Sequence, residues 1–146
     1  MVPLNVLVES LVIGNIYYFI NPQINSQEPH PHLYVGDKDD KSAFLICGTS
    51  QFEKRKRYFE LVGLPYETLV RIRPSEDNKL TTDTYINCND VQTHDFNSLF
   101  TYSKFSFYGT TTKSEQYEVK NGISISVLVE EDDKEIILGQ FPDFDL

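Results

Sequence analysis

The most apolar stretch of the chain is Ala43-Phe44-Leu45-Ile46-Cys47, and the polar turn Gly48-Thr49-Ser50 follows it at once. A short, unbroken apolar run that ends in turn-forming residues is typical of a β-strand buried on both sides. Shorter runs rich in aromatic and β-branched residues lie before and after it. We therefore predict strands over 15–20, 32–35, 43–47, 68–73 and 84–88.

The two ends of the sequence favour helices. Residues 4–13 fit both helical spacing and strand alternation, and we favour a short helix. Thr112 and Glu115 form a capping-box pattern, which predicts a helix that starts there. We expect Gly122 to interrupt that helix. Residues 123–137 again fit both periods, and we favour a second helix.

Two further segments are less regular. The charged stretch 52–63 ends in Gly-Leu-Pro and is expected to be a loop or a single helical turn. Residues 96–107 fit neither period clearly. The sequence contains no internal repeat and no low-complexity linker, so residues 1–146 are expected to form one domain. Several short strands with helical material near the ends predict a mainly β fold, a small closed or half-closed barrel.

The cysteine count, the N-terminal stretch and the net charge each restrict where the protein can act and what it can bind. Two cysteines, Cys47 and Cys88, are too few for a disulfide framework, and we expect reduced, inert thiols in a cytoplasmic protein. Glu9 and Asn15 interrupt the apolar N-terminal stretch, which predicts neither a signal peptide nor a membrane span. The net charge is −9. Such a chain repels nucleic acid at long range, so RNA binding would need a local basic patch.

The charges are unevenly distributed. Residues 130–146 carry seven acidic side chains against Lys134 alone. The only basic run is Lys54-Arg55-Lys56-Arg57, a candidate phosphate-binding patch or, alternatively, a solvated segment balanced by Glu53 and Glu60. We considered that the acidic segment 130–146 could lie over this basic run, or form an ordinary solvated helix face.

Polar residues flank two of the predicted strands. His30 and His32 are two apart at the entry to the second strand, so their side chains are expected to point the same way. They could act as a general base and acid, bind a metal, or be polar loop residues. Thr49 and Ser50 follow the apolar strand and could hydrogen-bond a phosphate, or simply start a turn. No third metal ligand has a recognisable spacing, so we expect neither a metal nor a cofactor.

The order of these segments resembles the MazF/PemK family of toxins from bacterial toxin–antitoxin pairs. Gly-Asn-Ile-Tyr-Tyr-Phe at 14–19 is similar to the family's Gly-Asp-Ile-type strand. His-Pro-His-Leu-Tyr-Val at 30–35 stands where the family has Arg-Pro-x-x-Val-Val. The apolar strand that ends in Thr49-Ser50 matches the family's third segment. The resemblance covers residues 14–90 approximately, and the chain after Val91 has no match.

The resemblance implies an SH3-like barrel of the MazF/PemK/CcdB type with a helical C-terminal part. It also implies a homodimer, an antitoxin partner, and metal-independent cleavage of single-stranded RNA by attack of the ribose 2′-hydroxyl. Carried over by position, His30 or His32 stands near the family's arginine, and Thr49 and Ser50 match its turn hydroxyls. The resemblance thus assigns His30, His32, Thr49 and Ser50 to catalysis and Lys54, Arg55, Lys56, Arg57, Arg71 and Arg73 to RNA binding.

Histidine in place of arginine leaves two other functions open, because histidine neither holds a permanent charge nor grips phosphate with two bonds. The first alternative is a non-catalytic barrel module, or an inactive family member, that binds an antitoxin or a topoisomerase-like target. The second is a metal-binding or regulatory domain that uses the histidines. We also expect the aromatic stretch Tyr102–Tyr108 to contribute to a two-fold interface.

Overall fold

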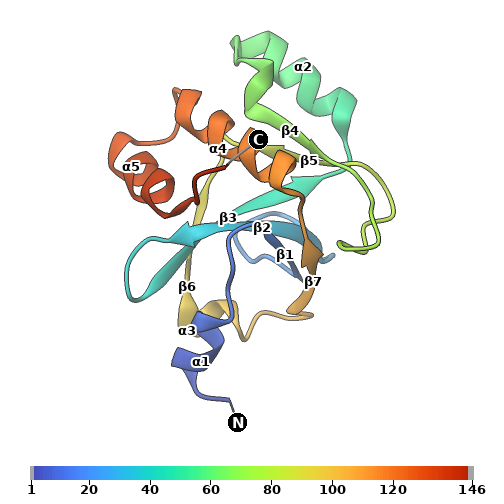
Figure 1. Ribbon diagram of the computed structural model, residues 1–146. Helices are drawn as coiled ribbons and strands as arrows, with labels where there is room; N and C mark the ends of the chain where they lie inside the picture. Colours follow the sequence, from blue (N-terminus) through green and yellow to red (C-terminus); the bar gives the residue numbers. More distant parts are fainter. Residues whose placement is uncertain (1, 145–146) are drawn as a thin grey trace.

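A computed structural model describes residues 2–144 as a curled antiparallel sheet with helices on both faces (Figure 1). The sheet has seven strands in the order β4-β5-β3-β2-β1-β7, and β6 pairs with another part of β3. The strands are β1 (Asn15–Phe19), β2 (His30–Asp37), β3 (Ser42–Thr49), β4 (Leu69–Ile72), β5 (Thr84–Asn87), β6 (Gln92–Asp95) and β7 (Ser106–Thr110). The mainly β, half-closed barrel predicted from the sequence is confirmed.

The helices cover the two faces of the sheet. They are α1 (Leu4–Glu9), α2 (Phe52–Val62), the 3₁₀ turn η1 (Tyr66–Thr68), α3 (Phe96–Leu99), α4 (Lys113–Ile125) and α5 (Glu131–Gln140). Helices α4 and α5 lie on one side of β2 and β3, while α1 and α3 lie on the other (Figure 1). Within residues 2–144, no helix has the length and apolar character needed to cross a bilayer.

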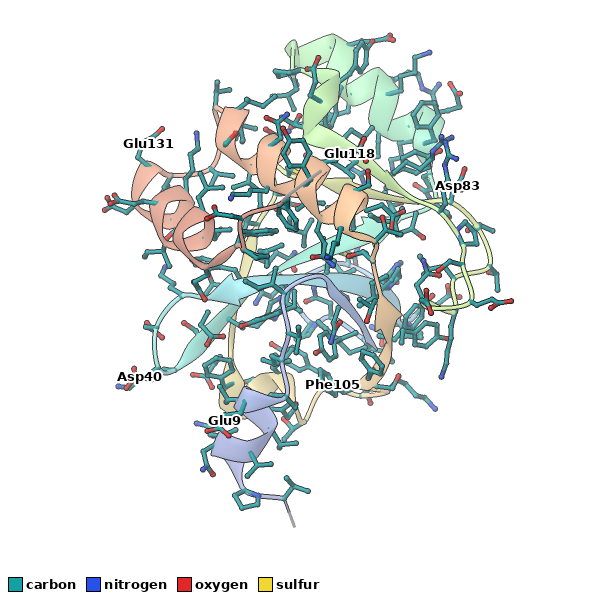
Figure 2. All side chains as sticks on the ribbon, in the orientation of Figure 1. Glu9, Asp40, Asp83, Phe105, Glu118 and Glu131 are labelled. Carbon is teal, nitrogen blue, oxygen red and sulfur yellow. The ribbon has the colours of Figure 1, made fainter. Side chains whose placement is uncertain are left out.

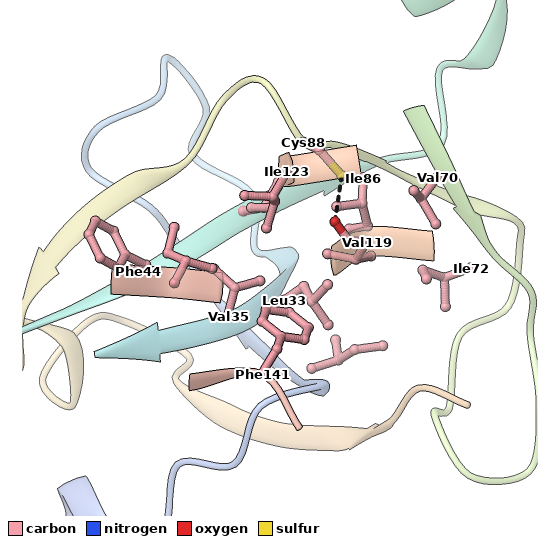
Figure 3. Packing of buried hydrophobic residues seen from close by; sticks show 13 residues of the cluster. Leu33, Val35, Phe44, Val70, Ile72, Ile86, Cys88, Val119, Ile123 and Phe141 are labelled. Carbon is pink, nitrogen blue, oxygen red and sulfur yellow. Dashed lines mark hydrogen bonds between the residues drawn. The ribbon is translucent and has the colours of Figure 1, made fainter. Parts of the chain in front are cut away.

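Strands β2 and β3 supply side chains to two separate cores, because alternate residues of a strand point to opposite faces. Leu33 and Ile46 face α4 and α5, where they pack with residues such as Val119 and Ile123 (Figure 3). Tyr34 and Leu45 face the other side, together with Tyr17, Phe19, Phe96 and Leu99. The prediction that 43–47 is buried on both sides is therefore confirmed.

Helix α4 begins as the sequence predicts but does not stop at the glycine. The Thr112 hydroxyl accepts the backbone N–H of Glu115, and the Glu115 carboxylate accepts the N–H of Thr112. The expected interruption at Gly122 is wrong, because the helix continues to Ile125. A Cβ at residue 122 would lie 2.7 Å from the Cys88 sulfur. The glycine thus serves close packing of α4 on the sheet.

The expectation of a loop over 52–63 is also wrong. These residues form the eleven-residue helix α2, in which only Phe59 is buried. Lys, Arg and Glu are good helix formers, and Gly63 ends the helix in the left-handed conformation with φ 76°. A helix that buries one residue shows little apolar periodicity, which explains why its sequence resembles a loop.

The acidic segment forms most of α5 and does not cover the basic run. Glu131, Asp132 and Asp133 lie in the first turn, where negative charge stabilises the helix dipole. Asp133 forms an ion pair at 3.7 Å with Lys38, which lies in the turn between β2 and β3. Glu131 points away from the sheet (Figure 2). In the described part of the chain, no ion pair joins α5 to α2, so of the two alternatives for the acidic segment the structure favours a solvated helix face.

Candidate functional site

A row of side chains crosses four strands on the outer face of the sheet. Thr49 of β3 stands opposite Tyr85 of β5, and Tyr85 stands opposite Arg71 of β4. On the other side of β3, His32 pairs with Cys47, and Gly48 lies against Pro31. Continued by two residues, this register puts His30 opposite Thr49. Directly opposed residues of antiparallel strands project from the same face. His30, Thr49, Tyr85 and Arg71 therefore form one row, which we call the rim row.

His30 lies at one end of the rim row and is half-buried. Its Nε2 is 3.1 Å from the hydroxyl of Ser26, which belongs to the loop between β1 and β2. On the β1 side, His30 stands opposite Phe19. The rim row thus begins with a partly buried imidazole that lies between a loop hydroxyl and an aromatic residue of β1.

The centre of the rim row is formed by the turn between β3 and α2. The Thr49 hydroxyl accepts the backbone N–H of Gln51 at 3.1 Å, which fixes its position, and Ser50 is exposed beside it. The ring of Phe52, the first residue of α2, lies 4.8 Å from the ring of Tyr85. Two hydroxyls and an aromatic pair are thus placed between His30 and Arg71.

Cations lie at the far end of the rim row and on α2. Arg71 and Arg73 are exposed, and Arg71 is 3.8 Å from Asp83. Lys54, Arg55, Lys56 and Arg57 form no ion pair within residues 2–144. Four consecutive residues point in different directions around a helix, so the run is not one patch. Arg55 lies close enough to Cys47 for its charge to oppose the effect of burial on the thiol.

The structure places His32 in the core and not on the surface. Its ring is fully buried and stacks on Phe19 at 3.8 Å between centroids. His32 Nδ1 donates to the His30 carbonyl at 2.8 Å, and Nε2 lies 3.0 Å from the Asn21 amide nitrogen. Burial lowers the pKa of His32 to about 3, so the ring is neutral at physiological pH.

A second histidine completes this buried network. His94 is also buried, and its Nε2 is 3.1 Å from the Gln92 carbonyl oxygen, to which Asn21 donates as well. Its Nδ1 is 3.0 Å from the Tyr102 hydroxyl. Burial lowers the pKa of His94 to about 4. We call His32, His94 and these partners the histidine core.

The thiols have the character of packing groups. Burial raises the pKa of Cys47 to about 11, an effect to which Asp90 adds and which Arg55 opposes. Burial also raises the pKa of Cys88 strongly. Thiolates are the reactive form, so neither residue is prepared for nucleophilic attack. Among residues 2–144, no three His, Cys, Asp or Glu side chains gather as a metal site requires.

The fold is similar to that of solved protein structures. An endoribonuclease in complex with its cognate antitoxin, from a mycobacterial species, matches with a TM-score of 0.54 at 14% identity, over 81% of this chain and 95% of that chain. The chain has the fold of the MazF-type toxins. The Mycobacterium tuberculosis toxin MazF-mt6 gives a TM-score of 0.48 at 14% identity, over 75% of this chain and 92% of that one. No family model and no curated protein matches the sequence.

Sequence reasoning grouped His30, His32, Thr49 and Ser50 at one rim, whereas the structure buries His32. It also missed two residues of the candidate site. Tyr85 lies in a strand that we predicted, and Phe52 lies in a segment that we expected to be a loop. Their roles depend on the pairing of β5 with both β3 and β4, which is a contact between distant parts of the chain. Only the alternation of Tyr85 with the buried Thr84 and Ile86 indicated its outward direction.

Proposed function

We propose that the protein is a metal-independent endoribonuclease that cleaves single-stranded RNA by attack of a ribose 2′-hydroxyl on the adjacent phosphate. The observation that supports this most strongly is the rim row, in which a histidine, hydroxyl side chains and an arginine lie on one face. The fold is that of a group that includes an endoribonuclease bound to its antitoxin. Such a reaction needs proton transfer and stabilisation of phosphorane charge, and it needs no metal.

Each residue has a role in this proposal. His30 removes the 2′-hydroxyl proton as the 2′-oxygen attacks phosphorus, the bond from phosphorus to the 5′-oxygen breaks, and the leaving oxygen takes a proton from water. The Thr49 and Ser50 hydroxyls donate to the phosphate oxygens, and Arg71 supplies positive charge. Arg73 and the cations of α2 (Lys54, Arg55, Lys56 and Arg57) hold the flanking phosphates. His32 acts indirectly, because its Nδ1 holds the His30 carbonyl and thereby fixes the backbone that carries the base. Tyr85 and Phe52 offer rings on which a base can stack.

The experiment is cleavage of a mixed-sequence single-stranded RNA in excess chelator, with the products' termini identified. We expect cleavage to continue and to leave a 2′,3′-cyclic phosphate and a 5′-hydroxyl, because the attacking group is the neighbouring ribose oxygen. Loss of cleavage in chelator would contradict the proposal. A 2′-deoxy nucleotide at the cleaved position is the matched control, and it should block the reaction.

The second candidate is a non-catalytic module that binds a protein partner, either an antitoxin or a topoisomerase-like target. The net charge of −9 favours it, because the chain as a whole repels RNA. Absence of RNA binding at low salt, where electrostatic attraction is strongest, would support this candidate over the nuclease.

We also propose an antitoxin partner, a cytoplasmic location and a two-fold homodimer. Of the four aromatic residues in 102–108, Phe107 is the most exposed, at 54%, and lies on the edge strand β7. Tyr102, Phe105 and Tyr108 pack largely within the chain. The dimer interface is therefore expected to centre on Phe107. Sedimentation at micromolar concentration checks this, and a monomer that persists there would contradict it.

A further inference from the structure

Strand β4 forms one edge of the sheet and has an unpaired side. The Thr68 carbonyl accepts the N–H of Cys88 at 2.8 Å, which fixes the hydrogen-bonding phase of the β4–β5 ladder. In an antiparallel ladder, alternate residues bond to the partner strand and the others point away from it. The main-chain groups of Leu69, Arg71 and Arg73 therefore point away from β5.

Two of these outward groups are already satisfied within the chain. The Leu69 N–H donates to the Tyr66 carbonyl, and the Arg73 N–H donates to the Glu115 carboxylate at 3.0 Å. Within residues 2–144, the Arg71 N–H and the carbonyls of Leu69 and Arg71 have no partner. The Glu115 carboxylate occupies the place that the carbonyl of an adjoining strand would take.

A cleft of about 750 Å³ lies along this unpaired edge. One wall is β4 with the preceding residue Tyr66, and the other is the first half of α4 with Ser114, Tyr117 and Glu118. The volume is in the range of ligand-binding clefts, about 300–1,000 Å³. Helix α4 forms the wall that faces the β4 edge, so a segment bound in the cleft would lie between β4 and α4.

The charges along the cleft distinguish between a peptide and RNA. Glu67, Glu115 and Glu118 line it together with Arg71 and Arg73, and Arg71 is paired with Asp83. The unpaired charge is therefore mainly negative. Taken over the whole cleft, the negative charges outnumber the cations, so the cleft favours lysine or arginine side chains of a peptide over a run of phosphates.

We propose that this cleft binds an extended peptide segment of a partner protein, which joins β4 as a further strand and directs basic side chains toward α4. Recognition then has two components. Main-chain hydrogen bonds to Arg71 and Leu69 hold any extended segment, and alternate basic residues meet the glutamates of α4 and η1. The peptide contacts use the main chain of β4, whereas the rim row uses the Arg71 side chain, so failure of the nuclease proposal would not affect this one.

The test uses the peptide Lys-Thr-Lys-Val-Lys-Thr, acetylated and amidated at its ends, with the full-length protein. We expect binding below about 1 mM, with slowed hydrogen exchange of the Arg71 amide in NMR spectra. Two further peptides are methylated on the backbone nitrogens of their odd or of their even residues. One of the two should lose at least about tenfold in affinity while the other binds as the parent does, because only alternate N–H groups face β4.

The second part of the test substitutes a residue that lines the cleft and compares it with a control residue on α5. Glu118→Lys should weaken binding of the parent peptide by about tenfold, whereas Glu131→Lys on the exposed turn of α5 should not change it. Equal effects of the two methylated peptides would overturn the proposal. So would absence of binding at about 1 mM, or protection of Arg71 by a single-stranded RNA and not by the peptide.

Discussion

His30 and His32 lie two residues apart on β2, and their side chains point to the same face, yet their surroundings are opposite. His30 is at the start of the strand, where it is half-buried and its Nε2 lies 3.1 Å from the Ser26 hydroxyl. His32 is covered by Phe19, and it forms hydrogen bonds on both ring nitrogens. One residue type on one strand face thus gives a half-buried residue in the rim row and a neutral, fully buried residue in the histidine core.

The two histidines differ in burial because other elements cover one half of the outer sheet face and not the other. Strand β6 and helix α3 pair or pack along residues 42–45 of β3, and they bring His94, Phe96 and Leu99 over that half of the sheet. Beyond Cys47, β3 pairs with β5 instead, and the ring of Phe52 at the start of α2 packs against Tyr85 there. The position of a residue along β2 or β3 therefore decides whether its side chain is buried or partly exposed.

The largest expected effect comes from substitution in the rim row. His30→Ala and Thr49→Ala should each lower the rate of RNA cleavage by about 10²–10⁴-fold, since each removes a proton-transfer or donor group. Thermal unfolding should change little, because both side chains are only partly buried. Asn25→Ala, on the same loop as Ser26, is the matched control. Cleavage at the wild-type rate in either variant would remove the rim row as the active site.

Substitution in the histidine core should show the reverse pattern. His32→Ala removes a fully buried ring and its hydrogen bonds, and it should lower the free energy of unfolding by about 3 kcal/mol. His30→Ala, made in parallel, should cost less than about 1 kcal/mol. Chemical denaturation of the two variants measures both values. Equal losses of stability would mean that the two histidines do not differ in burial as described.

These outcomes also bear on what the sequence could predict. The apolar run 43–47 and the capping box at Thr112 and Glu115 were sufficient for the central strand and for the start of α4. Both are local patterns. The burial of His32 could not be predicted, since it depends on residues 92–99 folding back over β2 and β3. The rim row likewise needs β5 to pair with two strands from other parts of the chain.

Helix α2 shows a different reason for failure. Its single buried residue, Phe59, leaves no apolar period, and its stability comes from good helix formers and the glycine at 63. Composition would have been a better guide than periodicity here. At Gly122 the composition was misleading instead. Glycine usually weakens a helix, but here it allows α4 to pack closely against Cys88.

A pH titration sharpens the comparison between the two histidines. The folded-state pKa values of His32 and His94 are about 3 and about 4, below the unfolded value near 6.5. The unfolded chain therefore binds more protons between these limits, and stability falls as the pH falls from about 6.5 toward 4. Each histidine should contribute a slope of about 1.4 kcal/mol per pH unit in that window.

Burial gives the physical reason for this sign, because it disfavours the charged ring of each histidine. At His32, a proton on Nε2 would also face the Asn21 amide nitrogen, which is itself a donor to Gln92. His32→Phe keeps a stacking ring and removes one titrating group, so it should reduce the slope by about half. A slope that does not change in this variant would contradict the assignment.

The smallest effect concerns how far the rim row extends onto α2. Arg55 is half-buried and acts on Cys47, which neighbours Thr49 on the same strand face, whereas Arg57 is exposed and lies about 200° further around the helix. Arg55→Gln should therefore weaken RNA binding and reduce the slope of log K against log salt by about one, as expected for one lost phosphate contact. Arg57→Gln should reduce that slope less. The charge change is identical in the two variants, so a difference between them reports position and not net charge. Equal slopes for the two variants would mean that α2 attracts RNA only through its overall charge, and the site would then end at Phe52.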